Sequence, residues 1–248
     1  MFKRLRLIIV ALLLVAAGWY VIQRVRESAP PPLLVDSSDF EHRVPPGTTQ
    51  VLVTARDPET RSVAQVTLWE KKGPKWVAVK GPYTARIGEN GFRPAEERTE
   101  GDGTTPQGVF PILAAFGGGG APNTTRIPYT VLRAGDCWIS ATDDPAYNRW
   151  VTREGCGSPN LDLFARGSQE NSLLHTALII GFNTSPRVVP RGSAIFFHLP
   201  RRDNANKVIP TTGGIGLGEG SLRAIISRLD ERFNPVAILG DRTWISGK

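Results

Sequence analysis

The side chains of this sequence best suited to nucleophilic or acid–base chemistry belong to three histidines and two cysteines. His198 ends the apolar run Ala-Ile-Phe-Phe-His, and a histidine at the mouth of a buried strand is well placed for an acid–base role. A histidine satisfied inside the core is the competing interpretation. His175 begins another apolar run and is either a functional residue or a residue at a strand edge. His42 lies in a polar linker.

A glycine-rich turn follows His198 after a polar loop. It has the sequence Pro-Thr-Thr-Gly-Gly-Ile-Gly-Leu over residues 210–217. A tight glycine turn directs backbone N–H groups into one concavity, which suits the stabilisation of an oxyanion. The position in such a turn that normally carries a nucleophile holds Gly214, which has no side chain.

Cys137 and Cys156 are the only cysteines, and they stand 19 residues apart. In a protein outside the cytoplasm, an even number of cysteines favours a disulfide. Two separate free thiols are one alternative, and a nucleophilic Cys156 within Glu-Gly-Cys-Gly-Ser is another.

Metal ligands and a serine nucleophile have no recognisable spacing in this sequence. It contains no CxxC or HxxxH pair and no GxSxG elbow. We therefore expect no metal ion and no other cofactor.

The N-terminus has the pattern of an export signal. Residues 1–6 are basic, and Leu7–Ile22 is a run of 16 residues without charge. A membrane-spanning helix needs about 20 apolar residues, and at least about 17, so this run is slightly short. Residues 1–26 are therefore either an uncleaved signal-anchor with its N-terminus inside or a signal peptide cleaved after Ala17. Both place the folded body outside the cytoplasm, in the periplasm or cell wall, either anchored to the cytoplasmic membrane or secreted.

The distribution of charge argues against a nucleic-acid partner, although the net charge is +7. The first 26 residues hold five basic residues and no acidic one, and the rest of the chain holds 25 basic and 23 acidic residues, a net charge of +2. A nucleic-acid-binding face needs a basic patch or stripe on the folded body. The sequence shows no such run there.

The composition indicates one β-rich domain. The chain contains 26 glycines and 20 prolines among 248 residues, which is high for a helical bundle, and its hydrophobic content of 40% is enough for a buried core. Residues 27–48 contain proline-rich stretches and form a predicted linker. Residues 49–248 form a predicted single domain.

Short apolar runs separated by glycine and proline turns predict many strands in this domain. One helix is predicted over Ser221–Arg232, because four of its aliphatic residues recur at i, i+3, i+4 and i+7. We therefore expect a mostly β fold with one late α-helix. The predicted strands are Gln50–Ala55, Val63–Glu70, Trp76–Val79, Tyr83–Ile87, Gly108–Leu113, Tyr129–Leu132, Cys137–Ser140, Ala177–Phe182, Ser193–Leu199 and Val236–Leu239.

Several segments resemble, in order, the motifs of the L,D-transpeptidase catalytic domain, which has the YkuD-type fold. The stretch Gly-Asp-Gly-Thr-Thr-Pro-Gln-Gly-Val-Phe resembles the family's GDGxTPxGxF motif, and Gly-Ser-Ala-Ile-Phe-Phe-His resembles its G-S-A-I-F-x-H motif. The glycine-rich turn stands where the family has P-T-x-G-C-V-x-L. The resemblance covers about residues 50–240 and implies the same β-rich fold. The resembling segments are Ala85–Phe92, Glu100–Pro111, Asp143–Asn148, Ile180–Asn183, Arg191–His198 and Pro210–Leu217.

The resemblance implies acyl-transfer chemistry on the bacterial cell wall. In active members, the cysteine of the S/T-x-G-C motif attacks a peptidoglycan stem tetrapeptide and releases D-alanine. The resulting thioester then passes to the amine of a neighbouring stem, which gives a 3→3 crosslink. The upstream histidine, which His198 matches, activates the thiol. Thr211, Thr212 and Gly213 match the residues before the cysteine, and Gly214 takes the place of the cysteine itself.

The resemblance also implies a substrate groove beside this turn. Its candidate substrate-binding residues are Tyr147, Asn148, Arg191, Ser193 and Thr211. Arg191 is expected to bind a carboxylate of the stem peptide.

Glycine cannot form a thioester, and loss of a covalent nucleophile removes most of the catalysed rate. Three hypotheses follow. The first is a non-catalytic protein that binds stem peptides or a protein partner in cell-wall assembly. The second is an active L,D-transpeptidase or L,D-carboxypeptidase that uses another nucleophile, such as Thr211 or Thr212. The third is an inactivated copy of a transpeptidase. The expected partners are stem peptides and, if the anchor is uncleaved, the membrane.

Overall fold

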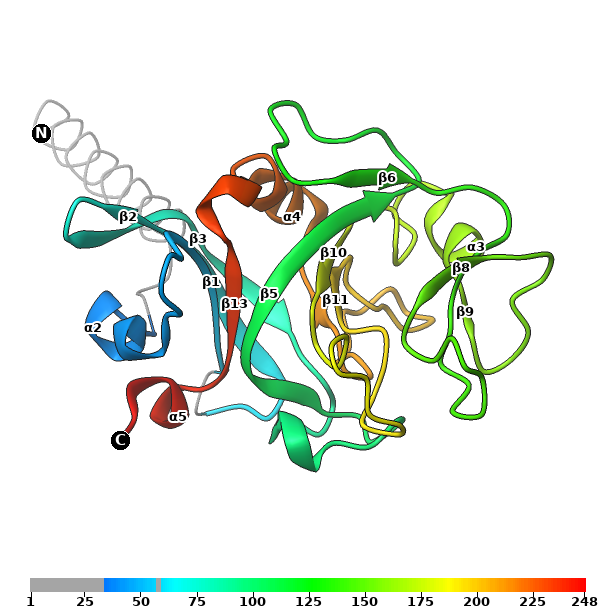
Figure 1. The fold of residues 1–248 in the computed structure, drawn as a ribbon, viewed down its shortest axis with the longest axis horizontal. Coiled ribbons are helices and arrows are strands. Elements are labelled where there is room, and N and C mark those ends of the chain that lie inside the picture. The colour runs from blue at the N-terminus through cyan, green and yellow to red at the C-terminus, as the bar shows by residue number, and fades with distance from the viewer. Residues whose placement is uncertain (1–33, 57–58) are drawn as a thin grey trace, which may run out of the picture. The chain divides into compact units, whose positions relative to one another are not determined.

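The structure is a computed structural model that describes residues 34–56 and 59–248 (Figure 1). The predicted signal over residues 1–26 and the first part of the predicted linker lie outside these residues. Within the described ranges, no helix has the length and apolar character needed to cross a membrane.

Ten strands of the described chain form one sheet that closes on itself as a barrel. The strands follow the order β10-β11-β12-β3-β2-β1-β13-β5, and β5 also pairs with β10, so the two ends of this path meet. Closure leaves no free edge along the ring. Strands β4 and β6 pair with β5 outside it. The ten strands are β1 Gln50–Arg56, β2 Val63–Lys72, β3 Lys75–Arg86, β4 Phe92–Pro94, β5 Thr105–Gly117, β6 Tyr129–Val131, β10 Ala177–Ile180, β11 Phe196–His198, β12 Ile215–Gly216 and β13 Val236–Asp241.

Alternate residues of the strands face two separate cores. On β1, Leu52 belongs to the core inside the barrel, whereas Val51 and Val53 belong to a second core on the outer face. This alternation is the two-residue period of a strand. Because both faces are covered, all three residues are buried.

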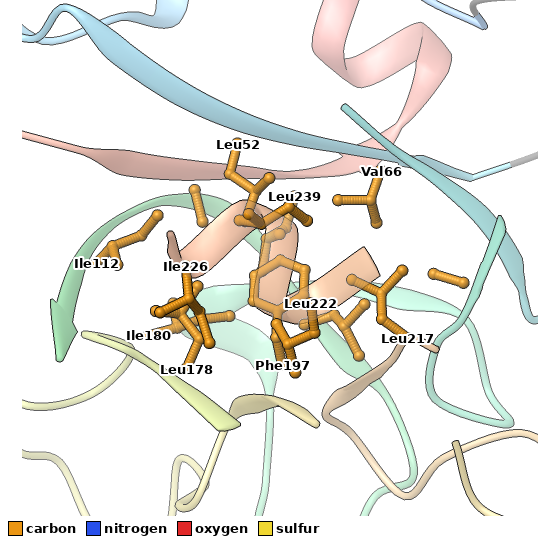
Figure 2. Close-up of a cluster of buried hydrophobic side chains, with 14 of the residues drawn as sticks. Leu52, Val66, Ile112, Leu178, Ile180, Phe197, Leu217, Leu222, Ile226 and Leu239 are labelled. Atoms are coloured by element: carbon orange, nitrogen blue, oxygen red, sulfur yellow. The ribbon is translucent and has the colours of Figure 1, made fainter. Parts of the chain in front are cut away.

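Helix α4, Glu219–Ile226, contributes its apolar face to the inner core. Leu222 and Ile226 are fully buried in the same cluster as Phe197 of β11 (Figure 2). The predicted helix and its aliphatic stripe are confirmed. The helix ends earlier than predicted, at Ile226 rather than Arg232, and a turn follows in which the Leu229 N–H still donates to the Ile225 carbonyl oxygen.

Residues 34–48 pack against the outer face of the sheet, so they do not form the predicted linker. Phe40, in helix α2 (Ser37–Phe40), is fully buried, and its ring centroid lies 5.2 Å from that of Trp69 on β2. The compact unit therefore already includes described residues before position 49, such as the buried Val35 and Phe40. The stretch is too short to show a helical or strand period, so its proline content dominated the prediction.

A smaller sheet with the strand order β8-β7-β9 accompanies helix α3, Leu163–Gly167 (Figure 1). A third core joins this sheet to the barrel. Its centre is Phe196 of β11, whose ring centroid lies 4.9 Å from that of Trp138 on β7 and 5.3 Å from that of Phe116 on β5. The strands of the smaller sheet are β7 Asp136–Trp138, β8 Trp150–Thr152 and β9 Leu161–Asp162.

The mostly β fold class is confirmed, but the prediction of a single helix is wrong. The described chain also contains the short helices α2, α3 and α5, the last spanning Arg242–Ser246. Strand β3 runs unbroken where two strands were predicted. The strand accommodates Gly81-Pro82 with an irregular register opposite Val66–Leu68.

A buried polar network fastens the segment after α4 to the start of the barrel. Arg228 donates to both carboxylate oxygens of Glu70, each at 2.7 Å. The side-chain amide of Gln50 donates to Glu70 at 3.0 Å, and its oxygen accepts from the backbone N–H of Asp230. Burial alone would raise the pKa of Glu70, but the hydrogen bonds from Arg228 and Gln50 outweigh it and lower the pKa.

We expect Glu70→Gln to lower the free energy of unfolding at pH 7 by about 1–2 kcal/mol, discounted because Arg228 is half exposed. A carboxylate with a lowered pKa stabilises the fold above its unfolded pKa, and this contribution is lost as pH falls through the folded pKa. The difference between wild type and variant should therefore shrink in acid. Urea unfolding at several pH values measures it, with the exposed Glu154→Gln as the control. A pH-independent difference would contradict the prediction.

Candidate functional site

The glycine-rich turn keeps its shape through Thr211, which is completely buried. Thr211 Oγ1 donates to the Gly214 carbonyl oxygen at 2.6 Å and accepts from the Gly213 N–H at 3.2 Å. Gly213 has a φ of +149°, and a Cβ there would lie 3.1 Å from the Thr104 carbonyl oxygen, so the position requires glycine. Thr211 is therefore a structural part of the turn, and its hydroxyl does not face a ligand.

His198 lies at the end of β11 and is buried. Its Nδ1 lies 2.6 Å from the Leu199 carbonyl oxygen, which can only accept, so we assign the ring proton to Nδ1. Burial, together with the nearby charge of Arg201, lowers the pKa of His198 to about 4 despite that hydrogen bond. The ring is therefore neutral at neutral pH, with Nε2 unprotonated.

His198 and Gly214 lie directly against each other, as the resemblance implies for the histidine and the nucleophile position. An ideal Cβ on Gly214 would lie 2.7 Å from both Cδ2 and Nε2 of His198, and 2.8 Å from the Phe196 carbonyl oxygen. Such distances are far inside van der Waals contact. The imidazole ring therefore fills the space that a side chain at position 214 would need, and close packing around the buried ring resists its displacement.

A pocket of about 320 Å³ opens beside the turn. Thr212, Gly213 and Gly214 line one part of it, and Pro159 and Leu161 line another. The pocket reaches Gly214 but does not include His198 in its lining. A ligand there meets the backbone of the turn and has no access to the imidazole.

A larger cavity of about 410 Å³ lies elsewhere, against Pro45, Pro111 and Pro235. Its lining contains one ionisable residue, Glu231, and no histidine or cysteine. The smaller pocket is therefore the candidate site, because chemistry-bearing groups converge on it and not on the larger cavity.

Tyr147 holds a charged residue at the pocket. Its hydroxyl donates to Glu100 Oε2 at 2.5 Å and accepts from the Gly192 N–H at 2.9 Å. Burial raises the pKa of Tyr147, and the hydrogen bond to Glu100 raises it further. The phenol therefore keeps its proton and remains a donor to the carboxylate.

Asn148 is buried and clamps the loop that carries Ser193. Its side-chain oxygen accepts from the indole N–H of Trp138 at 2.9 Å and from the Ala194 N–H at 3.1 Å. Its amide nitrogen donates to the Phe182 carbonyl oxygen at 3.1 Å. All these partners belong to the protein, so Asn148 shapes the site without facing a ligand.

Of the two remaining predicted binding residues, the structure places Ser193 in the pocket lining and Arg191 outside it. Ser193 Oγ donates to Ser140 Oγ at 2.8 Å, and both hydroxyls line the pocket. The backbone of Arg191 belongs to a turn closed by its N–H on the Val188 carbonyl oxygen. The expected carboxylate contact of Arg191 therefore has no counterpart in the pocket.

Two charged residues of the pocket, Arg98 and Glu100, were not among the predicted site residues. Arg98 is almost completely buried, and its Nε and Nη2 donate to Thr104 Oγ1 and Asp102 Oδ1, both at 3.0 Å. Its Nη1 has no partner among the described residues. Both residues stand in a loop, where charge follows no period, and only the neighbouring Gly-Asp-Gly motif could have drawn attention to them.

The predicted disulfide between Cys137 and Cys156 is confirmed. Because these are the only two cysteines of the chain, neither is available as a nucleophilic thiol. Asn160 connects the bridged loop to the pocket. Its amide nitrogen donates to the Cys156 carbonyl oxygen at 2.9 Å, and its oxygen accepts from the Ser140 N–H at 2.8 Å.

The other two histidines lie away from the pocket lining. His175 Nδ1 is 3.2 Å from the Gly167 carbonyl oxygen, and its Nε2 is 3.9 Å from Glu219 Oε1, so it fastens neighbouring loops. His42 is exposed in a 3₁₀ turn, Glu41–Arg43.

Comparison with protein-family models, with characterised proteins and with solved structures gives no significant match. The function of the site must therefore be inferred from its geometry. The pocket offers backbone groups, hydroxyls, the Glu100 carboxylate and the Arg98 guanidinium, while the imidazole behind Gly214 is neutral and enclosed. Among the described residues, the side chains of the lining offer polar and charged groups to a ligand, and the ring of His198 is not one of them.

We expect the double substitution Cys137→Ser and Cys156→Ser to lower the free energy of unfolding by roughly 2–4 kcal/mol, because it releases the loop that the bridge closes. Urea unfolding followed by tryptophan fluorescence measures the loss. Alkylation of the protein as isolated, without reductant, should label neither cysteine. Labelling of both thiols under these conditions would contradict the bridge.

We also expect His198 to lower the stability as pH falls from about 6.5 to about 4. The unfolded chain takes up a proton at the ordinary histidine pKa, whereas the buried ring does so only at the lower value, so protonation favours unfolding in this window. His198→Gln should flatten the dependence of unfolding free energy on pH between 4 and 6.5. The exposed His42→Gln serves as the control, and identical slopes for all three proteins would refute the assignment.

Proposed function

We propose that this protein is a non-catalytic relative of the L,D-transpeptidases, with a YkuD-type domain that binds peptidoglycan stem peptides outside the cytoplasm. The observation that carries the proposal is the contact between Gly214 and His198. The position that holds the nucleophile in active members has no side chain, and the histidine ring occupies the space for one.

The arrangement of the resembling segments supports a retained binding site. Segments far apart in the sequence contribute Glu100, Tyr147, Ser193 and Gly213, and these residues lie in or beside one pocket. A motif resemblance without functional meaning gives no reason for such convergence. The pocket lies beside the turn that would have carried the nucleophile.

The disulfide supports an extracytoplasmic location, because such bridges persist mainly in oxidising compartments. It agrees with the export pattern of the N-terminal residues. Stem peptides are found in the same compartment.

An enzyme with another nucleophile finds little support in the site. Thr211 is completely buried and its hydroxyl is engaged within the turn. Both cysteines are in the disulfide. Thr212 faces the pocket, but the only hydrogen bond of the His198 ring in the described chain is to Leu199, so no base activates it.

A recently inactivated transpeptidase also fits the structure less well. Such a protein would keep the space for a cysteine, and Gly214→Cys would restore the reactive pair. The 2.7 Å approach of His198 means that the added side chain overpacks the site, which typically costs about 1–3 kcal/mol.

We expect wild-type protein to bind a disaccharide-tetrapeptide without releasing D-alanine or forming an acyl adduct. Binding is measured by NMR shifts at Gly213 and Gly214, and turnover and adducts by mass spectrometry. Thr212→Trp should fill the pocket and abolish binding, whereas Thr243→Trp, at an exposed position of helix α5, should not. Absence of binding to the wild type would overturn the proposal.

Gly214→Cys should be less stable than wild type and should form no adduct with a carbapenem or the tetrapeptide. An adduct on the wild type would reveal another nucleophile, which peptide mapping would locate. An adduct on Gly214→Cys alone would show an intact site that lacks only its nucleophile, in favour of the inactivated transpeptidase.

A further inference from the structure

Three arginines from separate segments of the chain gather on one part of the barrel surface. Arg126 precedes β6, whereas Arg228 and Arg232 lie between α4 and β13. Arg126 and Arg232 both bind Oδ2 of Asp230, at 3.5 and 2.6 Å. No run of basic residues marks this surface in the sequence, because tertiary contacts create it.

The hairpin of β2 and β3 adds two lysines to this surface. Arg228 bonds to Glu70 on β2, so the hairpin lies beside the segment that follows α4 (Figure 1). Side chains alternate between the two faces of a strand, so Lys72 shares the face of Glu70. Lys75 pairs with Lys72 and Val77 pairs with Glu70, which places both β3 residues on that face too. Neither lysine forms an ion pair within the described ranges.

The positive charges of this surface are exposed, while the negative charges that hold them are buried. The side chains of the three arginines are between 49% and 70% exposed, and the two carboxylates that they bind are 11% and 2% exposed. In the segments that supply the cations, residues 71–77, 124–128 and 226–234, the one exposed acidic residue is Glu231. A partner that approaches this surface therefore meets mainly positive charge.

Two large apolar side chains are exposed among these cations. Phe233 is 40% exposed and Val77 is 39% exposed. The Arg232 guanidinium carbon lies 5.9 Å from the centroid of the Phe233 ring. A surface that only keeps a protein in solution mixes charges of both signs and exposes few large apolar side chains. Clustered cations with apolar side chains between them are typical of a surface that binds an anionic membrane.

The predicted anchor would bring a membrane within reach of this surface. The described chain begins at Leu34, whose N–H donates to the side-chain oxygen of Gln65 on β2 at 2.8 Å. Residues 23–33 connect Leu34 to the uncharged run over residues 7–22. A connection of this length spans at most about 40 Å when fully extended. An uncleaved anchor therefore keeps β2, and the hairpin that it forms, close to the bilayer.

We propose that this surface docks on the anionic phospholipid headgroups of a bilayer. The three arginines, Lys72 and Lys75 bind the phosphate groups, and Val77 and Phe233 enter the headgroup region. The inference does not rest on the proposed function, because the surface shares no residue with the lining of the candidate pocket.

The test places a fluorophore on the hairpin of the full-length protein through Val77→Cys. The protein is reconstituted in bilayers of phosphatidylcholine alone and of an equimolar mixture with phosphatidylglycerol, both containing a nitroxide-labelled lipid as quencher. The predicted anchor is present in both bilayers, so the lipid charge is the only difference. We expect strong quenching in the anionic bilayer alone, and added salt should reverse it because salt screens exposed charges.

The matched position for the fluorophore is Thr243→Cys. Thr243 is exposed on α5, which follows β13 at the end opposite to Phe233. Its quenching should not depend on the lipid charge.

The double substitution Lys72→Gln and Lys75→Gln tests the charges without breaking an ion pair. It should lower the ratio of docked to undocked protein by about thirtyfold, since each lysine near an anionic surface contributes about fivefold. Arg166→Gln with Lys207→Gln removes the same charge at exposed positions outside the surface and should leave the ratio unchanged.

Four outcomes would overturn the inference. They are equal quenching in the two bilayers, quenching in neither, equal effects of the two double substitutions, and a response to a soluble phosphate compound without a response to the anionic bilayer. Glycerol phosphate and a short DNA duplex, each added to the protein in detergent, are the probes for the last outcome. Such a response would identify a soluble phosphate compound or a nucleic acid as the partner.

Discussion

The closure of the barrel through β5 is the constraint on which the rest of the structure depends. This strand pairs with β13 along one part of its length and with β10 along another, so it joins the two ends of the sheet. Its first residue, Thr105, follows the loop of Arg98 and Glu100. Its last three residues pair with β6, and Phe116 among them packs in the core that joins the smaller sheet to the barrel. The loop before β11, the glycine-rich turn before β12 and the loop before β5 are therefore brought to one place.

The site itself depends on the close approach of the glycine-rich turn to the Thr104 backbone and to the His198 ring. Gly213 and Gly214 can lie against Thr104 and His198 only because neither carries a side chain. The same feature that removes the nucleophile therefore lets the turn pack tightly and encloses the imidazole. Enclosure in turn removes the charge from His198, since a buried imidazole without an acidic partner loses its proton readily.

The sequence predicted the parts of the fold that carry a period. The apolar runs of β1 and β13 were recognisable because both faces of these strands are buried over several residues. The apolar stripe of α4 was recognisable because one face of the helix is buried. The strands β9 and β12 contain two residues each and have no period to detect. At the site, His198 and Gly214 were found through their motifs, whereas Glu100 and Arg98 were not, because their roles come from tertiary contacts.

The smaller sheet has a consequence for how such a pocket can diversify. Pro159 and Leu161 line the pocket. They belong to a segment that the Cys137–Cys156 bridge and Asn160 hold together independently of the barrel strands. The barrel supplies the turn and Glu100, while this segment supplies the facing wall. Substitutions and length changes in the wall can therefore alter which ligand fits without disturbing strand pairing in the barrel, so the selectivity of the pocket can evolve separately from the stability of the scaffold.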